Sequence, residues 1–145
     1  MDILPATLRD LGSLRRLEHA CFLEDSWPLL DLVAVLTYPD VIRLKAVNGD
    51  KMIGFIAADL RPVEGIAWIA TVGVLPEYRR QGIALALLRE CECRIKQPRI
   101  HLCVRLSNQA AIRLYQEEGY LAMDTWQKYY SDGENALVME KMRES

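Results

Sequence analysis

The sequence contains few of the residues that build metal sites or disulfide frameworks. Its 145 residues include two histidines, His19 and His101, and four cysteines, Cys21, Cys91, Cys93 and Cys103. No two cysteines form a Cys-x-x-Cys pair, and the histidines are not spaced as zinc ligands are. We therefore expect reduced thiols and no bound metal.

Long apolar runs and an excess of one charge are also absent. No run of about 18 apolar residues occurs, and the first residues lack the basic and apolar segments of a signal peptide. Lysine and arginine (18 residues) nearly balance aspartate and glutamate (20 residues). The composition therefore gives no electrostatic reason to expect a nucleic acid or a membrane as partner. We expect a cytoplasmic protein and favour a monomer.

Nothing in the sequence divides the chain into separate parts. It has no low-complexity tract, internal repeat or linker rich in glycine and serine, and 51% of its residues are hydrophobic. A chain of this length can bury one sizeable core but is too short for two ordinary domains. We expect residues 1–145 to form a single domain.

Hydrophobic periodicity and turn residues predict a mixture of helices and strands. Helices are expected at residues 9–22, 29–38, 82–96 and 108–118, and strands at residues 3–5, 43–47, 52–60, 66–74, 99–105, 120–130 and 135–141. Asn48-Gly49 predicts a tight hairpin turn because both residues tolerate positive φ, so the middle strands are antiparallel. The helix between Val74 and Arg99 joins two strands by a crossover, which requires parallel pairing. The predicted fold class is α/β (α+β), with a central mixed, mostly antiparallel twisted sheet of about seven strands and about four helices.

The segment Arg79-Arg80-Gln81-Gly82-Ile83-Ala84 lies between a predicted strand and a predicted helix. The first amides of a helix lack intrahelical acceptors and lie at the positive end of its dipole, so small residues there let a diphosphate approach. Taken alone, the segment fits equally well a polar helix start whose glycine serves packing. The Walker and Rossmann glycine patterns are absent, which argues against ATP and NAD as ligands.

Two motifs resemble those of the GNAT acetyltransferase superfamily. Arg79, Gly82 and Ala84 match its Gln/Arg-x-x-Gly-x-Gly/Ala turn, and residues 108–120 resemble its Asn-x-x-Ala-x-x-Leu-Tyr-x-x-x-Gly-Phe/Tyr helix. Residues 128–139 resemble the RimI-like branch, which acetylates protein N-termini, including that of a ribosomal protein. The resemblance implies a GNAT fold, acetyl-CoA as cofactor and a protein or peptide N-terminus as acceptor.

The resemblance also implies roles for individual residues. The strand before the turn would splay around Gly73, with the Val74 N–H facing the thioester oxygen. Asn108 would contact the pantetheine arm, and Tyr115 would give a proton to the departing thiolate. Without the motif, an aromatic residue at the core-facing spacing of Tyr115 is more often packing. The cofactor-binding residues implied are Val72, Val74, Arg79, Arg80, Gln81, Gly82, Ile83, Ala84, Asn108 and Tyr115.

At the position of the general base, this sequence differs from the RimI-like branch. Five residues before Asn108, where the RimI-like branch has a glutamate and one related group a histidine, this sequence has Cys103; a tyrosine of that related group falls at Trp68. An α-amine has a reference pKa of about 8, compared with about 10.4 for lysine, so a weak base suffices for it. We hypothesise that water held by backbone carbonyls and by His101 or Cys103 takes the proton. Ordinary strand residues are the alternative for both side chains.

Three aromatic residues are candidates to bind the acceptor. Trp27 lies in the loop before the second predicted helix, and Tyr129 and Tyr130 lie near the end of the chain. In an extended strand the two tyrosines would point to opposite faces, so at most one would face the acceptor. A small amine as acceptor, or a catalytically weak acetyl-CoA-binding module, stays open as an alternative function.

Overall fold

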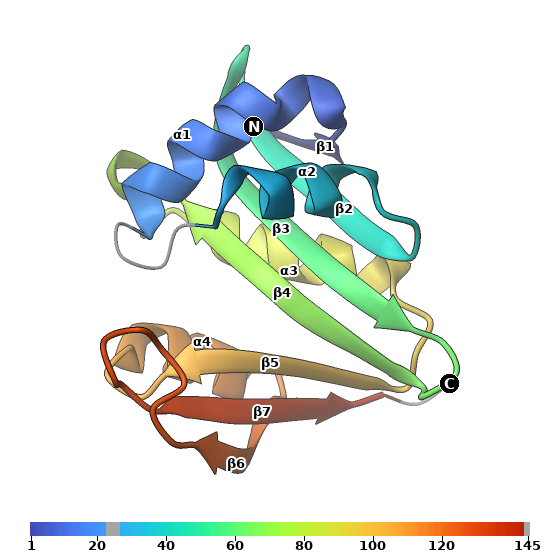
Figure 1. The fold of residues 1–145 in the computed structure, drawn as a ribbon, viewed down its shortest axis with the longest axis vertical. Coiled ribbons are helices and arrows are strands. Elements are labelled where there is room, and N and C mark those ends of the chain that lie inside the picture. The colour runs from blue at the N-terminus through green and yellow to red at the C-terminus, as the bar shows by residue number, and fades with distance from the viewer. Residues whose placement is uncertain (23–26, 144–145) are drawn as a thin grey trace. The chain divides into compact units, whose positions relative to one another are not determined.

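The structure is a computed structural model that describes residues 1–22 and 27–143. In these residues seven strands form a sheet in the order β1-β2-β3-β4-β5-β7-β6, accompanied by four α-helices (Figure 1). By its internal contacts the chain divides into two compact units, Met1–Leu60 with Ala70–Ile95, and Arg61–Ile69 with residues 96–143. The mixed sheet and the four helices confirm the predicted fold class. The single domain stays a prediction.

The first unit contains an antiparallel set of strands covered by helices. Its elements are β1 (Asp2–Pro5), a 3₁₀ turn η1 (Leu8–Asp10), α1 (Leu11–Cys21), α2 (Leu29–Thr37), β2 (Val41–Asn48), most of β3 (Lys51–Arg61), the second half of β4 (Ile66–Val74), a 3₁₀ turn η2 (Pro76–Tyr78) and α3 (Ile83–Arg94). β1 pairs with β2, and β2 with β3, both antiparallel. Gly49 has φ +63° between the paired residues Asn48 and Lys51, which confirms the predicted hairpin turn.

The core of the first unit lies between α1, α2 and one side of the strands. Leu14 and Leu17 of α1, with Leu32 and Leu36 of α2, pack against Phe55 of β3. All five side chains are almost fully buried. The helical spacing of the leucines is therefore explained by a shared apolar interface, as amphipathic helices require.

The second unit contains the other half of the sheet. Its elements are the first half of β4, β5 (Arg99–Arg105), α4 (Gln109–Glu117), β6 (Leu121–Trp126) and β7 (Ala136–Met142). β4 pairs with β5 in parallel over Ile66–Ile69 and Arg99–Leu102, which confirms the predicted crossover. β7 pairs antiparallel with both β5 and β6.

The predicted strand at residues 120–130 is wrong at its end, because β6 stops at Trp126. Lys128 has φ +51°, a left-handed conformation that interrupts an extended strand. Backbone hydrogen bonds then close a turn, from Gly133 N to Tyr130 O (2.9 Å) and from Tyr130 N to Glu134 O (3.2 Å). The residues between β6 and β7 therefore form a hydrogen-bonded loop.

Among the residues that the structure describes, no helix is long and apolar enough to cross a bilayer.

Candidate active site

The turn before α3 has the geometry that an anion-binding helix start requires. Gly82 is the N-terminal cap of α3 with φ +79°, no side chain caps the helix, and the first helical hydrogen bond runs from Ala86 N to Gly82 O (3.0 Å). The amides before Ala86 therefore have no acceptor within the helix. In the described part of the chain, a Cβ atom at Gly82 would meet nothing within 4 Å, so the space beside Gly82 is open.

Arg79 stabilises the end of β4 next to this turn. Its Nε donates a hydrogen bond to the Val74 carbonyl oxygen (3.0 Å), and the Cys21 thiol donates to the same oxygen (3.3 Å). Burial raises the pKa of Cys21, so this thiol stays protonated and keeps its role as donor. Arg79 thus joins the turn to the strand whose residues Val72 and Val74 were predicted to bind the cofactor.

The second predicted motif lies in α4, in the second unit. Asn108 caps this helix, because its Oδ1 accepts the Ala111 N–H (3.2 Å). Tyr115 faces inward and is 7% exposed, with its ring centroid 5.8 Å from that of Tyr120. Burial raises the pKa of Tyr115 to about 12. The phenol is therefore protonated at neutral pH and able to donate a hydrogen bond.

His101 is held in one orientation by an ion-pairing partner on the neighbouring strand. Its Nε2 lies 2.7 Å from Oε2 of Glu140, the residue opposite it in the β5–β7 register. Because a carboxylate oxygen accepts, Nε2–H is the donor of this hydrogen bond. Nδ1 is buried and has no hydrogen-bond partner in the described part of the chain. Sequence reasoning did not identify Glu140 as this partner, since only the strand register brings the two together.

Cys103 lies two residues after His101, on the same face of β5. The parallel pairing of β4 with β5 ends at Leu102, one residue before it. Cys103 is half-buried, and burial raises the pKa of its thiol. The protonated thiol is therefore favoured, which makes Cys103 a weaker candidate for a base than His101.

Tyr129 and Tyr130 belong to a chain of aromatic rings in the second unit. Ring centroids lie 5.9 Å apart for Trp68 and Trp126, 5.4 Å for Trp126 and Tyr129, and 5.0 Å for Tyr129 and Tyr130. Trp68 also contacts the His101 ring edge to face at 4.9 Å. The expectation that the two tyrosines point to opposite faces is wrong, because they lie in a turn and their rings are in contact.

Arg105 connects the loop between β6 and β7 to the end of β5. Its Nη1 donates to Asp132 (2.9 Å) and Glu134 (2.8 Å), and its guanidinium lies 4.2 Å from the Tyr130 ring centroid. Hydrogen bonds from the Glu134 backbone and then from Arg105 lower the pKa of Asp132, and hydrogen bonds from Ser107 and then Arg105 lower that of Glu134. Arg105 therefore positions the loop that carries both tyrosines.

Trp27, the remaining predicted acceptor residue, is half-buried and packs against the core of the first unit. Residues 23–26, which precede Trp27 and Pro28 in the sequence, lie outside the described residues. Its contact with an acceptor stays a prediction.

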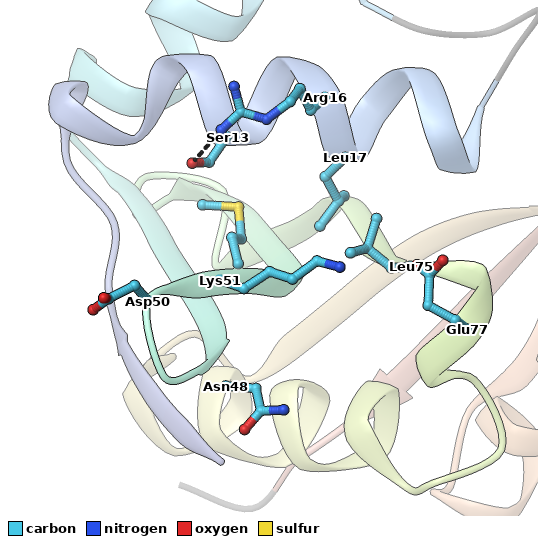
Figure 2. A pocket seen from close by; sticks show the side chains of 9 residues that line it. Ser13, Arg16, Leu17, Asn48, Asp50, Lys51, Leu75 and Glu77 are labelled. Carbon is cyan, nitrogen blue, oxygen red and sulfur yellow. Dashed lines mark hydrogen bonds between the residues drawn. The ribbon is translucent and has the colours of Figure 1, made fainter.

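A cavity of about 630 Å³ lies in the first unit, and none of the predicted site residues is among those that line it (Figure 2). Arg16 of α1 and Lys51 of β3 contribute positive charge to it, and Asp50 and Glu77 contribute negative charge. The mixed charge indicates no single class of ligand. The residues lining it are Ser13, Arg16, Leu17, Asn48, Asp50, Lys51, Met52, Leu75 and Glu77.

One buried ionisable residue was missed by sequence reasoning. Glu18 of α1 is 2% exposed, and neither of its carboxylate oxygens has a hydrogen-bond partner within the described ranges. Burial raises its pKa to about 7. The signal was present in the sequence, because Glu18 follows Leu14 by four residues and so falls on the apolar face of the helix.

Known proteins resemble the chain over most of its length. The model of the Acetyltransferase (GNAT) family matches residues 11–120. The catalytic subunit NAA10 of the N-terminal acetyltransferase A complex from Arabidopsis thaliana is 29% identical over 143 residues, which cover 94% of this chain and 74% of that protein. The ribosomal-protein-S18-alanine N-acetyltransferase from Escherichia coli is 26% identical with a TM-score of 0.88, covering 99% of this chain and 95% of that one. Arabidopsis thaliana NAA60, crystallised with acetyl-CoA, shares the fold with a TM-score of 0.85 at 21% identity, covering 97% of each chain.

Proposed function

We propose that this chain, which belongs to the GNAT acetyltransferase family and is an N-acetyltransferase, transfers acetyl from acetyl-CoA to the N-terminal α-amine of a protein or peptide. The family match over residues 11–120 supports the reaction class. The observation that carries the proposal is the open turn at Gly82, where uncapped helix amides can receive a diphosphate. The N-terminal acetyltransferases among the similar proteins support the acceptor class.

The residues at the turn suit the diphosphate of acetyl-CoA, because the helix start is uncapped and Arg80 adds positive charge next to it. Acetyl-CoA supplies a thioester whose carbonyl carbon is attacked by an amine. The chain must orient that carbonyl, and the Val74 N–H is our candidate donor for its oxygen. Arg79 and Cys21 support this role, since both hold the Val74 carbonyl in place.

His101 and Glu140 are our candidates for removing the proton from the amine. Glu140 accepts the Nε2–H, so Nδ1 is the ring nitrogen of His101 that would take the proton of the amine, and the carboxylate 2.7 Å away would stabilise the imidazolium that forms. An α-amine needs only a weak base at neutral pH, because its reference pKa is about 8. The pair therefore substitutes for the carboxylate that Cys103 replaces.

Tyr115 is our candidate for stabilising the departing sulfur. Its pKa of about 12 lies well above that of an ordinary thiol, about 8.5. Full proton transfer to a thiolate is therefore unfavourable, whereas a hydrogen bond to the developing negative charge is favourable. We assign Tyr115 this donor role.

The Tyr115→Phe variant tests this assignment. We expect kcat to fall about a hundredfold with acetyl-CoA affinity unchanged, because only the phenolic donor is lost. Tyr120→Phe is the control, since it removes a buried phenol that contacts the Tyr115 ring without taking part in the reaction. Equal losses of kcat in both variants would show that the effect is structural.

The acceptor class is tested by incubating the protein with acetyl-CoA and either lysine-free peptides with free N-termini or spermidine. We expect release of free CoA and a mass increase of one acetyl group on the peptides. Turnover with spermidine alone would assign a small amine as acceptor. Tight binding of acetyl-CoA without CoA release would leave a binding module.

A further inference from the structure

We propose that Trp68, Trp126 and Tyr129 form an aromatic platform that selects acceptors whose first residue has a large apolar side chain. This inference rests on the proposed function, because it concerns the acceptor of the same reaction. The three residues come from β4, from the end of β6 and from the turn after β6. Their rings form a continuous series of contacts, with centroids 5.9 Å and 5.4 Å apart.

The aromatic platform lies on the sheet face that carries the proposed base. Trp68 is opposite His101 in the β4–β5 register and its ring contacts the His101 ring. Trp126 is opposite Ala136, which is in turn opposite Arg105, two residues beyond Cys103. Alternation along β5 places His101, Cys103 and Arg105 on one face. The platform and the base therefore share that face.

The aromatic platform is connected to the proposed base through Trp68. The Trp68 ring lies 4.9 Å from the His101 ring, and the Trp126 ring contacts both the Trp68 ring and the Tyr129 ring. An amine that loses its proton near His101 is one bond from the Cα atom that carries the first side chain. That side chain would therefore lie beside Trp68, from which the series of ring contacts continues to Trp126 and Tyr129.

The aromatic platform exposes apolar surface to water. Trp126 is 37% exposed and Tyr129 is 53% exposed, although Ala136 and Val138 on the adjacent strand are fully buried. Aromatic surface left in water gains free energy when a second apolar group covers it. The outer sides of these two rings are therefore available to an apolar ligand group.

The carboxylates of Glu140, Asp132 and Glu134, on the same half of the sheet as the aromatic platform, already have partners within the protein. Glu140 is paired with His101, and Asp132 and Glu134 are paired with Arg105. The Arg105 guanidinium also lies over the ring of Tyr130, the neighbour of Tyr129, so a cation already covers that aromatic face. Asp124 is exposed on β6, two residues before Trp126, and its carboxylate would favour a cationic first residue instead. The experiment therefore includes a peptide that begins with arginine.

The experiment compares kcat/KM for four lysine-free peptides that differ only in their first residue, which is alanine, leucine, phenylalanine or arginine. We expect leucine and phenylalanine to be preferred over alanine about tenfold, equivalent to about 1.4 kcal/mol. In the Trp126→Ala variant this preference should fall to less than about twofold. Trp126→Phe should retain most of the preference. Thr125→Ala, on the other face of β6, is the control and should change nothing.

The ratio between peptides does not depend on how much of a variant is folded, so a loss of stability cannot imitate the expected result. Equal kcat/KM for alanine and leucine in the wild type would overturn the inference, and so would an equal loss for all peptides in Trp126→Ala. A preference for arginine would assign the platform to cationic acceptors instead. Failure of the proposed function looks different, because no peptide would be acetylated while spermidine is, and the inference would fall with it.

Discussion

The Gly82 turn in the first unit and the aromatic platform in the second unit are built in opposite ways. The turn uses backbone amides, a left-handed glycine and open space, whereas the platform uses three large side chains from β4, β6 and a loop. A backbone site is encoded by a few consecutive residues. A side-chain site requires segments that are distant in sequence to be brought together by strand pairing.

The turn is the feature whose disruption should have the largest effect. Gly82→Val places a β-branched residue at φ +79° and a side chain in front of the helix amides. We expect the affinity for CoA to fall about a thousandfold, equivalent to about 4 kcal/mol, because the diphosphate loses its approach to these amides. Titration calorimetry with CoA measures this directly.

Gly49→Val is the matched control for this substitution. Gly49 also has a left-handed conformation, φ +63°, and a Cβ atom there would likewise meet nothing within 4 Å, but it lies in the β2–β3 hairpin. Both variants should lose about 1–2 kcal/mol of stability from backbone strain. A loss of CoA affinity in Gly49→Val equal to that in Gly82→Val would mean that strain, not the site, explains the result.

The sequence predicts the Gly82 turn better than it predicts the contacts of the aromatic platform. The bounds of β4 and β5 were predicted correctly, because both are apolar runs between clear turn residues, and Gly82 and Asn108 were placed correctly at helix starts. The ring contact of Tyr129 with Tyr130 was not predicted, since a positive φ at Lys128 has no local signal of the kind that Asn-Gly provides. The His101–Glu140 pair and the contact of Trp68 with Trp126 depend on strand register, which a single sequence does not specify.

The two units also differ in whether a buried ionisable side chain has a hydrogen-bond partner. In the second unit His101 is paired with Glu140, whereas in the first unit Glu18 has no hydrogen-bond partner among the described residues and a pKa raised from 4.5 to about 7. Between these two pH values the unfolded chain loses the Glu18 proton while the folded chain keeps it. The free energy of unfolding therefore falls as pH rises from about 4.5 through about 7, by about 3 kcal/mol in total.

Glu18→Gln should remove this loss, because a glutamine is neutral throughout the range. The unfolding free energy of the variant minus that of the wild type should increase by up to about 3 kcal/mol between pH 4.5 and pH 8. Urea denaturation at several pH values measures this difference. Glu64→Gln is the control, since it removes a carboxylate from an exposed turn. If the unfolding free energies of the wild type and of Glu18→Gln changed in parallel with pH, Glu18 would ionise at the same pH in the folded and the unfolded chain.

The smallest expected effect concerns how the aromatic loop is held. Arg105→Ala removes the donor to Asp132 and Glu134, and ion pairs that are partly exposed contribute modestly. We expect the KM for the acceptor peptide to rise about fivefold, because Tyr129 and Tyr130 lose their fixed placement, with CoA affinity unchanged. Steady-state kinetics with saturating acetyl-CoA measures this, and Arg94→Ala, which removes an exposed ion pair with Glu90 on α3, is the matched control.

The contact of Arg105 with Asp132 and Glu134 should also depend on pH. Because the pKa values of both carboxylates are lowered, the contact is present at neutral pH and is lost as pH falls through them. The acceptor KM of the wild type should therefore rise toward that of the variant in acid. An acceptor KM in Arg105→Ala that matches Arg94→Ala at neutral pH would show that the aromatic loop holds its tyrosines without Arg105, and that the side-chain site is as locally determined as the Gly82 turn.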